Sequence, residues 1–178
     1  GAPIDIPDHA ARACEVALRM HETLVELNRG WRAAGKREIA IGIGLNTGPM
    51  AVGNMGSTAR FEYTVLGDNV NLGSRLEALT KEYGVGILVG EATAKAAADR
   101  FVFREIDRVR VKGRATAVPV VEFVGRAGTT LDPAWAEGLA LYRAGKFLEA
   151  RQVFVTLDEA AAKIMTKRCE VLAADPPE

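Results

Sequence analysis

The segment from Tyr63 to Glu77 most constrains the fold of this chain, because a short β-type stretch leads there directly into a helical pattern. Asp68, Asn71 and Arg75 fall on one stripe of that helix, at spacings of three and four residues. Apolar residues form a second stripe at helical spacing, namely Leu72, Leu76, Leu79 and Tyr83. The pattern predicts a strand followed by a helix that buries one side and shows polar groups on another.

The polar stripe combines groups that suit a phosphate ligand. A guanidinium has five donors in a planar fork that matches phosphate oxygens, and a helix N-terminus adds unpaired N–H groups and a positive dipole end. Two simpler interpretations remain open, in which Asn71 caps a local turn and Arg75 is solvated or pairs with Glu82. We predict an anion-binding helix, with Asp68 among the residues that bind the ligand.

Four segments in chain order carry a specific resemblance to a known family. They are Ile41–Gly48, Val52–Gly56, Tyr63–Asn71 and Arg75–Glu77. At matching gaps, the chain from Gly1 to about Val124 resembles the class III nucleotide cyclases, which close a nucleoside triphosphate into its 3′,5′-cyclic monophosphate. The resemblance implies an α+β fold, the ferredoxin-like cyclase sandwich, in which helices cover a mostly antiparallel sheet.

The same resemblance assigns roles to individual residues. Asn71 matches the asparagine that orients the ribose, and Arg75 matches the arginine that stabilises negative charge on the α-phosphate. Thr64 stands where the family reads the purine edge, and a threonine there favours adenine, so that ATP is the expected substrate. Lys112 and Arg114 resemble the basic loop that reaches the terminal phosphates, and the sequence leaves open which of them makes the contact.

Cyclases of this class also use two divalent ions, Mg²⁺ or Mn²⁺, as cofactors. The family holds them with two aspartates on strands upstream of an aromatic-Gly-Ala-Pro step, and this chain opens on Gly1-Ala-Pro3. Asp5 and Asp8 lie beyond that step and match neither ligand, and the lysine that the family pairs with the Thr64 position is also lacking. The resemblance therefore implies metal ligands from a preceding segment, and we expect this polypeptide to make no cyclic nucleotide alone.

Composition is that of an ordinary soluble protein. The 178 residues have 48% hydrophobic content and a formal net charge of +0, which gives no sign of binding to nucleic acid or to a membrane surface. Cys14 and Cys169 lack metal or disulfide spacing and are expected to be reduced in a cytoplasmic setting. His9 and His21 lack the partners of a zinc site. No apolar stretch is long enough for a membrane helix, although an anchor upstream remains open.

The pattern along the chain predicts a truncated cyclase domain at 1–125, a linker at 126–131 and a helical tail at 132–178. Expected helices cover 8–29, 68–83 and 91–98, and expected strands cover 38–46, about 50–55, 61–66, 85–89, 101–111 and 117–124. The glycine run at 42–48 lies in strand-like sequence, which favours close backbone packing or clearance for a ligand over a dinucleotide-binding loop.

The tail has spacings of a tetratricopeptide repeat at Gly138, Phe147, Ala150 and Phe154. A single repeat cannot bury its own face, so the tail either packs on the cyclase core or its dimer mate, or binds a peptide.

Class III domains work as dimers, and the resemblance implies a homodimer with the site between protomers. An open sheet edge is also expected to cause self-association. Two other classes remain open: a non-catalytic partner that borrows metal ligands from another chain, and a protein-interaction module that acts through the tail.

Overall fold

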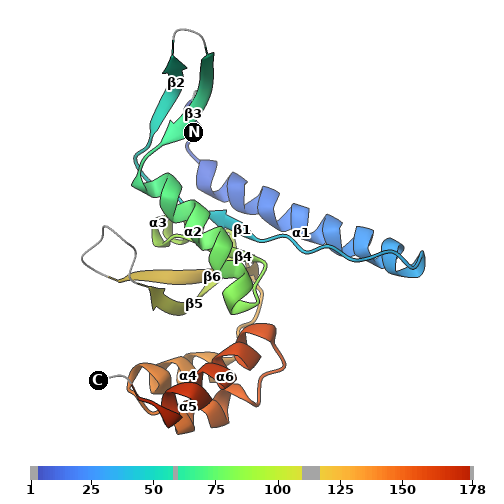
Figure 1. Ribbon diagram of the computed structural model, residues 1–178, viewed down its shortest axis with the longest axis vertical. Coiled ribbons are helices and arrows are strands. Elements are labelled where there is room, and N and C mark those ends of the chain that lie inside the picture. The colour runs from blue at the N-terminus through green and yellow to red at the C-terminus, as the bar shows by residue number, and fades with distance from the viewer. Residues whose placement is uncertain (1–3, 58–59, 110–116, 177–178) are drawn as a thin grey trace.

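The computed structural model describes residues 4–57, 60–109 and 117–176. In chain order its elements are α1 (His9–Ala33), β1 (Ile43–Leu45), β2 (Ala51–Ser57), β3 (Arg60–Leu66), α2 (Asp68–Tyr83), β4 (Ile87–Val89), α3 (Glu91–Ala96), β5 (Phe101–Val109), β6 (Val118–Arg126), α4 (Pro133–Arg143), α5 (Phe147–Phe154) and α6 (Ala160–Ala174). Figure 1 shows a hairpin arm at one end of the molecule, the sheet with α1 and α2 in the middle, and the helices α4, α5 and α6, called the tail below, at the other end. The predicted α+β class is confirmed.

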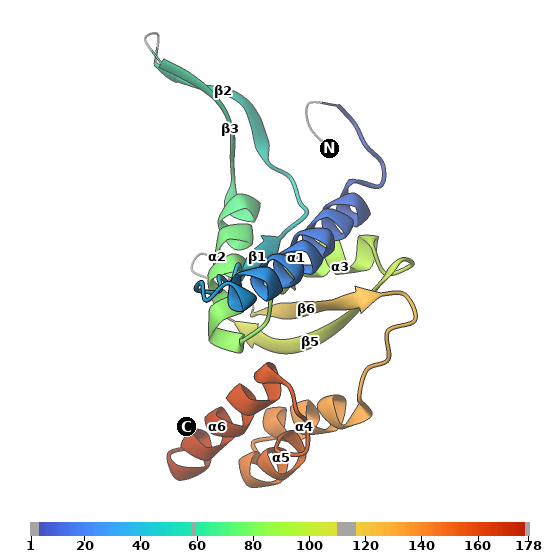
Figure 2. The same ribbon diagram turned by 90° about the vertical axis from the view of Figure 1, so that its right-hand side faces the viewer.

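The main sheet has four strands in the order β1-β4-β6-β5. Strand β1 runs parallel to β4, whereas β6 is antiparallel to both β4 and β5. Strands β2 and β3 form a separate two-stranded sheet that projects from the body, as the turned view in Figure 2 shows. The sequence had suggested one sheet. Pro49, which precedes β2, has no N–H to donate to a neighbouring strand. Gly67, which follows β3, has a φ of 141°, outside strand geometry. The chain therefore leaves the main sheet on both sides of this hairpin.

Several element boundaries differ from those expected, and the largest differences are at α1 and β1. Helix α1 continues past Gly30 and ends at Ala33, just before Gly35, which has a φ of 67°, while the Lys36 N–H donates to the carbonyl of Trp31 at 2.8 Å. This is a glycine-terminated helix end, and Gly30 is an ordinary helical residue. Strand β1 is shorter than the predicted 38–46, because its partner β4 offers only three residues for pairing. Helix α2, in contrast, has the predicted bounds and ends before Gly84, whose φ is 65°.

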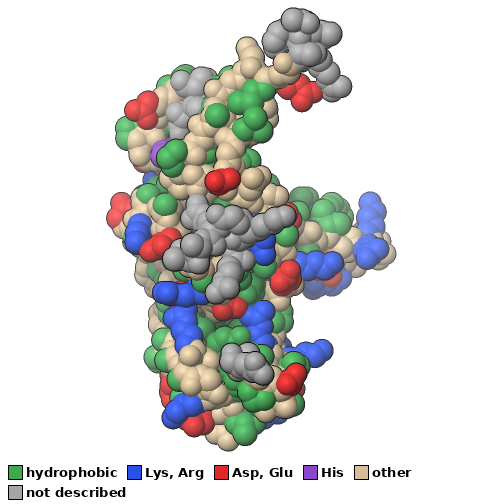
Figure 3. Space-filling model, turned by 60° about the vertical axis from the view of Figure 1, so that its left-hand side comes forward, with side chains coloured by type: hydrophobic (Ala, Val, Ile, Leu, Met, Phe, Trp, Pro, Cys, Tyr) green, Lys and Arg blue, Asp and Glu red, His purple; other side chains and the backbone are tan. Residues whose placement is uncertain are grey.

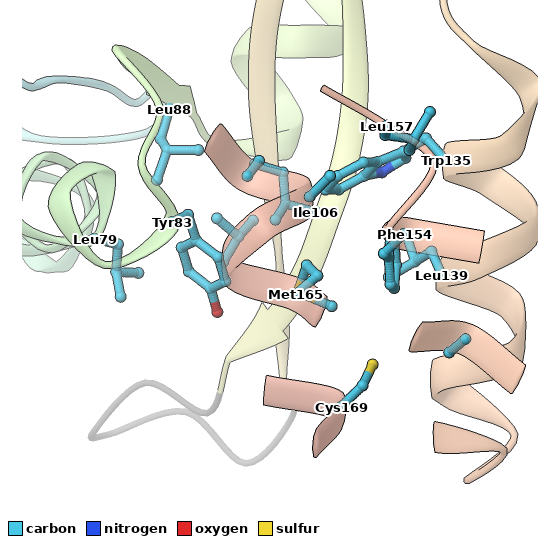
Figure 4. Close-up of a cluster of buried hydrophobic side chains, with 14 of the residues drawn as sticks. Leu79, Tyr83, Leu88, Ile106, Trp135, Leu139, Phe154, Leu157, Met165 and Cys169 are labelled. Atoms are coloured by element: carbon cyan, nitrogen blue, oxygen red, sulfur yellow. The ribbon is translucent and has the colours of Figure 1, made fainter. Parts of the chain in front are cut away.

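One buried cluster joins the sheet, α2 and the tail. Figure 4 shows Tyr83 of α2 and Ile106 of β5 near Trp135, Phe154 and Met165 of the tail helices, and all five side chains belong to the same core. The tail therefore packs on the body of the molecule, which is one of the two arrangements left open by the sequence. Its assignment as a tetratricopeptide-like unit, and the proposed domain limits, remain predictions.

The glycine run is explained by the contact between β1 and α2. A Cβ atom built on Gly44 would overlap the backbone of Gly73 and Glu77, and one on Gly42 would overlap the Thr80 side chain. Only glycine lets this strand approach the helix so closely. The close-packing interpretation of the run is confirmed.

This contact predicts opposite effects for two glycine-to-alanine changes. Gly44→Ala should lower the free energy of unfolding by about 1–3 kcal/mol, because the backbone that it meets cannot move aside cheaply. Gly30→Ala should instead raise it by up to about 1 kcal/mol, since that site is helical and has open space around it. Urea denaturation of both variants measures the difference, and equal effects would contradict the packing account.

Candidate functional site

Helix α2 carries the predicted site, and its burial explains its orientation. Leu72, Leu76 and Leu79 are buried along one side, and the Gly44 contact holds the same helix against β1. These contacts leave the stripe with Asn71 and Arg75 at the surface, where both residues are exposed. The buried stripe thus fixes which way the polar stripe faces.

The polar stripe has no partner inside the described part of the chain. Neither the Asn71 amide nor the Arg75 guanidinium makes a hydrogen bond or ion pair with any described residue. Among these residues Asn71 therefore caps no turn and Arg75 does not pair with Glu82, whereas the alternative of a solvated Arg75 agrees with its exposure. An amide and a guanidinium remain available to a ligand or a second chain.

The start of α2 is also open. Its N-cap is Gly67, which contributes no side-chain hydrogen bond, so the first-turn N–H groups lack a side-chain cap. Asp68 is exposed in this first turn, where the helix dipole favours a carboxylate. Thr64 lies on β3, exposed and opposite Gly53 in the arm that leads into the helix. The fold thus brings Asp68, Asn71 and Arg75 onto one helix and places Thr64 on the preceding strand.

A network of asparagines secures this end of the helix. The side-chain amide of Asn46 donates to the Asn69 carbonyl at 2.9 Å, and the Asn69 amide donates to the Pro49 carbonyl at 2.9 Å. Thr47, in the same turn, shares a hydrogen bond with Thr93 at 2.9 Å. The turn after β1 and the first turn of α2 therefore hold each other in place. Sequence reasoning did not single out Asn69, although the Asn46-Thr-Gly48 step belonged to the segments that carried the resemblance.

Arg75 lines a cleft of about 540 Å³ between α2, the end of β5 and the tail. The other lining residues are Ala78, Leu79, Glu82 and Tyr83 from α2, Asp107, Arg108 and Val109 from β5, and Tyr142 and Arg168 from the tail. Lys112 and Arg114 lie outside the described residues. Val109, the last described residue before them, lines the same cleft as Arg75.

A hydrogen-bonded group of three side chains forms the inner wall of this cleft. The Tyr83 hydroxyl donates to Asp107 Oδ2 at 2.6 Å, and Arg168 Nη1 donates to the same oxygen at 2.5 Å. Burial, together with the Asp107 carboxylate, raises the pKa of Tyr83 to about 12, so the hydroxyl keeps its proton. Burial opposes the charge on Arg168, but its Tyr83 and Asp107 neighbours outweigh this and raise its pKa. Nothing in the sequence pattern pointed to Arg168, because its partners are distant in the chain.

A second ionic group attaches the tail to the sheet. Arg104 of β5 is buried between Glu122 of β6 and Glu159 at the start of α6, and its guanidinium lies 4.1 Å from the centre of the Trp135 ring. The Trp135 indole N–H also donates to the Glu105 carbonyl at 3.0 Å. Burial raises the pKa of Glu122, and the charge of Arg104 works against that rise. Arg104 and Trp135 therefore hold the tail in addition to the contact that Arg168 makes in the cleft.

Charged side chains lie at the surface where the tail meets the body of the molecule. Figure 3 shows Lys, Arg, Asp and Glu side chains gathered where the tail meets the body of the molecule, while hydrophobic side chains lie along the projecting arm.

In the described ranges, no group of three His, Cys, Asp or Glu side chains is placed to hold a metal ion. Both cysteines are free and buried. Every helix in the described part of the chain is too short or too polar to cross a lipid bilayer.

Comparison with known proteins decides the family. The family model described as "Adenylate and Guanylate cyclase catalytic domain" matches residues 1–123. The chain belongs to this cyclase family. Adenylate cyclase 1 of Rhizobium meliloti is 39% identical to it over 124 residues, which are 70% of this chain and 19% of that protein. The cyclase chain thus spans about a fifth of the length of this relative.

Two solved structures show the same fold. The adenylyl cyclase CyaB from P. aeruginosa is 32% identical with a TM-score of 0.61, and the match covers 70% of this chain and 64% of that one. The guanylyl cyclase Cya2 is 36% identical with a TM-score of 0.56, covering 73% of this chain and 64% of the other. The predicted cyclase sandwich is confirmed. The tail lies beyond the residues that the family model matches.

The geometry of α2 predicts that its polar stripe can be altered without unfolding the cyclase fold. Arg75→Ala and Asn71→Ala should each change the free energy of unfolding by no more than about 0.5 kcal/mol, because both side chains are exposed and unpaired among the described residues. Leu76→Ala, one helical step away and fully buried, should cost about 2–5 kcal/mol. Thermal and urea denaturation compare the three, and a large loss for Arg75→Ala would show that its role is structural.

Proposed function

We propose that this chain is part of an adenylyl cyclase, which converts ATP to 3′,5′-cyclic AMP and pyrophosphate for intracellular signalling. The observation that carries the proposal is the exposed stripe of Asn71 and Arg75, which pairs with no described residue, on a helix whose opposite side is buried. Water satisfies these groups in the free chain, and the fold leaves them accessible to a ligand or a second chain. Membership of the cyclase family supports a nucleoside triphosphate as that ligand.

The reaction accounts for the residue types. Attack of the ribose 3′-oxygen on the α-phosphorus forms the new P–O bond, expels pyrophosphate and increases the negative charge around the phosphorus. Arg75 stabilises this charge, and donors aimed at developing charge contribute roughly 3–4 kcal/mol in other enzymes. Asn71 holds the ribose so that its 3′-oxygen faces the phosphate, which is a positioning role. In this proposal Asp68 helps to bind the substrate, and Lys112 or Arg114 contacts its terminal phosphates.

Adenine is the proposed base because Thr64 stands at the position that reads the purine edge. The name of the Rhizobium meliloti relative supports this choice, whereas Cya2 is named as a guanylyl cyclase. Thr64 is exposed on β3, so it is accessible to a ligand or a second chain. A comparison of ATP with GTP as substrate tests the base preference in the active assembly.

The two divalent ions are part of the proposal, but the described residues do not fit them. No cluster of three potential ligands exists in the described part of the chain. We therefore propose that carboxylates outside this sequence bind the Mg²⁺ or Mn²⁺ ions. The cytoplasm, where ATP and free thiols such as Cys14 are found, is the proposed location.

A homodimer is the proposed assembly, and two surfaces support it. Within the described residues β1 pairs with β4 alone, which leaves its other edge open to a strand. The β2–β3 arm exposes large apolar side chains, namely Val52, Tyr63, Val65 and Leu66. Arms and open edges of this kind associate with other chains.

Self-association of the 178-residue chain should depend on the arm. Sedimentation at tens of micromolar should show species larger than a monomer, and Val65→Lys should shift them toward monomer by placing a charge on the exposed apolar surface. Leu148→Lys is the matched control, because Leu148 is also exposed but lies on α5 in the tail. A wild-type chain that stays monomeric throughout would contradict the proposal.

Complementation tests the catalytic role directly. We expect no cyclic AMP from the isolated chain with ATP and Mg²⁺ or Mn²⁺. Mixing it with a metal-competent cyclase domain that lacks the arginine corresponding to Arg75 should restore synthesis. Arg75→Ala in this chain should then reduce kcat about 10²–10³-fold. Arg151→Met, which alters only an exposed ion pair with Glu170 in the tail, should leave activity unchanged. An active mixture that does not depend on Arg75 would overturn the assignment.

A second candidate function is a non-catalytic cyclase partner that lends Asn71 and Arg75 to a different, metal-binding chain. The lack of a cluster of metal ligands among the described residues supports this candidate. The residues encoded before Gly1 discriminate the two, since two aspartates in metal-binding context and a lysine there support the homodimeric enzyme. A third candidate, an independent interaction module in the tail, is less favoured because the tail shares its core with α2.

A further inference from the structure

The last turn of α2 is tied to the tail by a specific set of polar contacts. Tyr83, the final residue of the helix, lies two turns beyond Arg75, or about 12 Å at the helical rise of 1.5 Å per residue. Its side chain is only 1% exposed, and it lies in the cluster that α2 shares with the tail (Figure 4). A movement of this turn would therefore move Arg75 as part of the same rigid helix.

Three side chains from three elements meet at Tyr83, and we call them the α6 clasp: Tyr83 of α2, Asp107 of β5 and Arg168 of α6. Asp107 Oδ2 accepts hydrogen bonds from both the Tyr83 hydroxyl, at 2.6 Å, and Arg168 Nη1, at 2.5 Å. Arg168 Nη1 also reaches the Tyr83 hydroxyl oxygen at 3.3 Å, and the guanidinium lies 5.1 Å from the centre of the tyrosine ring. Each member of the clasp contacts both others.

The clasp is not the only attachment of the tail. Trp135, Arg104 and Glu159 make the main polar junction, and the buried core around Phe154 and Met165 supplies the apolar contact. Loss of the Arg168 guanidinium would leave those contacts intact. It would also leave the largely buried Asp107 carboxylate without its cationic partner, which weakens the hold on Tyr83.

The clasp also adjoins the proposed site. Arg168 and Tyr83 line the same cleft as Arg75, so the tail supplies part of the wall beside the proposed catalytic arginine. The other end of α2 is fixed independently, by the hydrogen bonds among Asn46, Asn69 and Pro49. The clasp is therefore the polar contact at the C-terminal end of α2 that connects this helix to the tail.

We propose that Arg168 is a positioning residue, which acts through Asp107 and Tyr83 to hold the C-terminal half of α2 and thereby sets the place of Arg75. The catalytic consequence rests on the proposed cyclase function. The tail is then a built-in support of the site, and a partner or modification that shifts α6 would change cyclase activity through this contact without touching the nucleotide.

Amide hydrogen exchange of the 178-residue chain tests the clasp without any need for activity. Arg168→Met, which keeps the apolar stem, should speed exchange in the second half of α2 about tenfold while α1 and β6 stay at wild-type rates. Tyr83→Phe should act in the same region, and Arg168→Lys should partly restore protection by keeping the charge. Arg151→Met is the matched control, because its exposed ion pair with Glu170 stays within the tail. Unchanged exchange in α2, or an equal increase throughout the chain, would overturn the proposal.

The complementing mixture supplies the second measurement. Arg168→Met should lower kcat about tenfold or more with little change in KM, because a misplaced Arg75 loses its effect in the transition state. A wild-type kcat in this variant would contradict the positioning role. A wild-type mixture that makes no cyclic AMP would instead refute the proposed function, and the exchange data would then still decide whether the clasp holds α2.

Discussion

The close contact between α2 and β1 is the constraint on which the rest of the structure depends. Gly44 in β1 allows the strand to touch the helix backbone, Gly42 just before the strand makes room for the Thr80 side chain, and leucines on the same helix fill the core below it. Because that side of α2 is committed to packing, the side with Asn71 and Arg75 has to face outward. Packing thus decides which way the proposed site residues Asn71 and Arg75 face.

The tail holds the C-terminal end of the same helix. Its apolar core and the Arg104 junction dock it on the sheet, while Arg168 reaches α2 through Asp107 and Tyr83. The region that the family model matches and the helices beyond it are therefore one packed body around the cleft beside Arg75. For the proposed site, completed by a second chain, an exposed polar stripe on a firmly held helix is favourable, because ready geometry costs no reorganisation.

Local pattern was enough to predict part of this arrangement. The bounds of α2 followed from its apolar periodicity, and the glycine spacing indicated close packing of a strand. The separate hairpin and the short β1 were not predicted, because they depend on which strands find partners. The end of α1 was placed too early, because Gly30 was taken as its stop and the helix ends before Gly35 instead. Arg168 is 61 residues from Asp107, and no spacing rule connects positions so far apart. The roles of Asn71, Arg75 and Thr64 came from the resemblance, and they remain predictions.

A structure of the complemented assembly with an ATP analogue that lacks the 3′-hydroxyl tests the central claim most directly, because such a nucleotide binds but cannot cyclise. Our account predicts that the Arg75 guanidinium donates to an oxygen of the α-phosphate while the Asn71 amide contacts the ribose. A nucleotide bound elsewhere, with both side chains still in solvent, would contradict it.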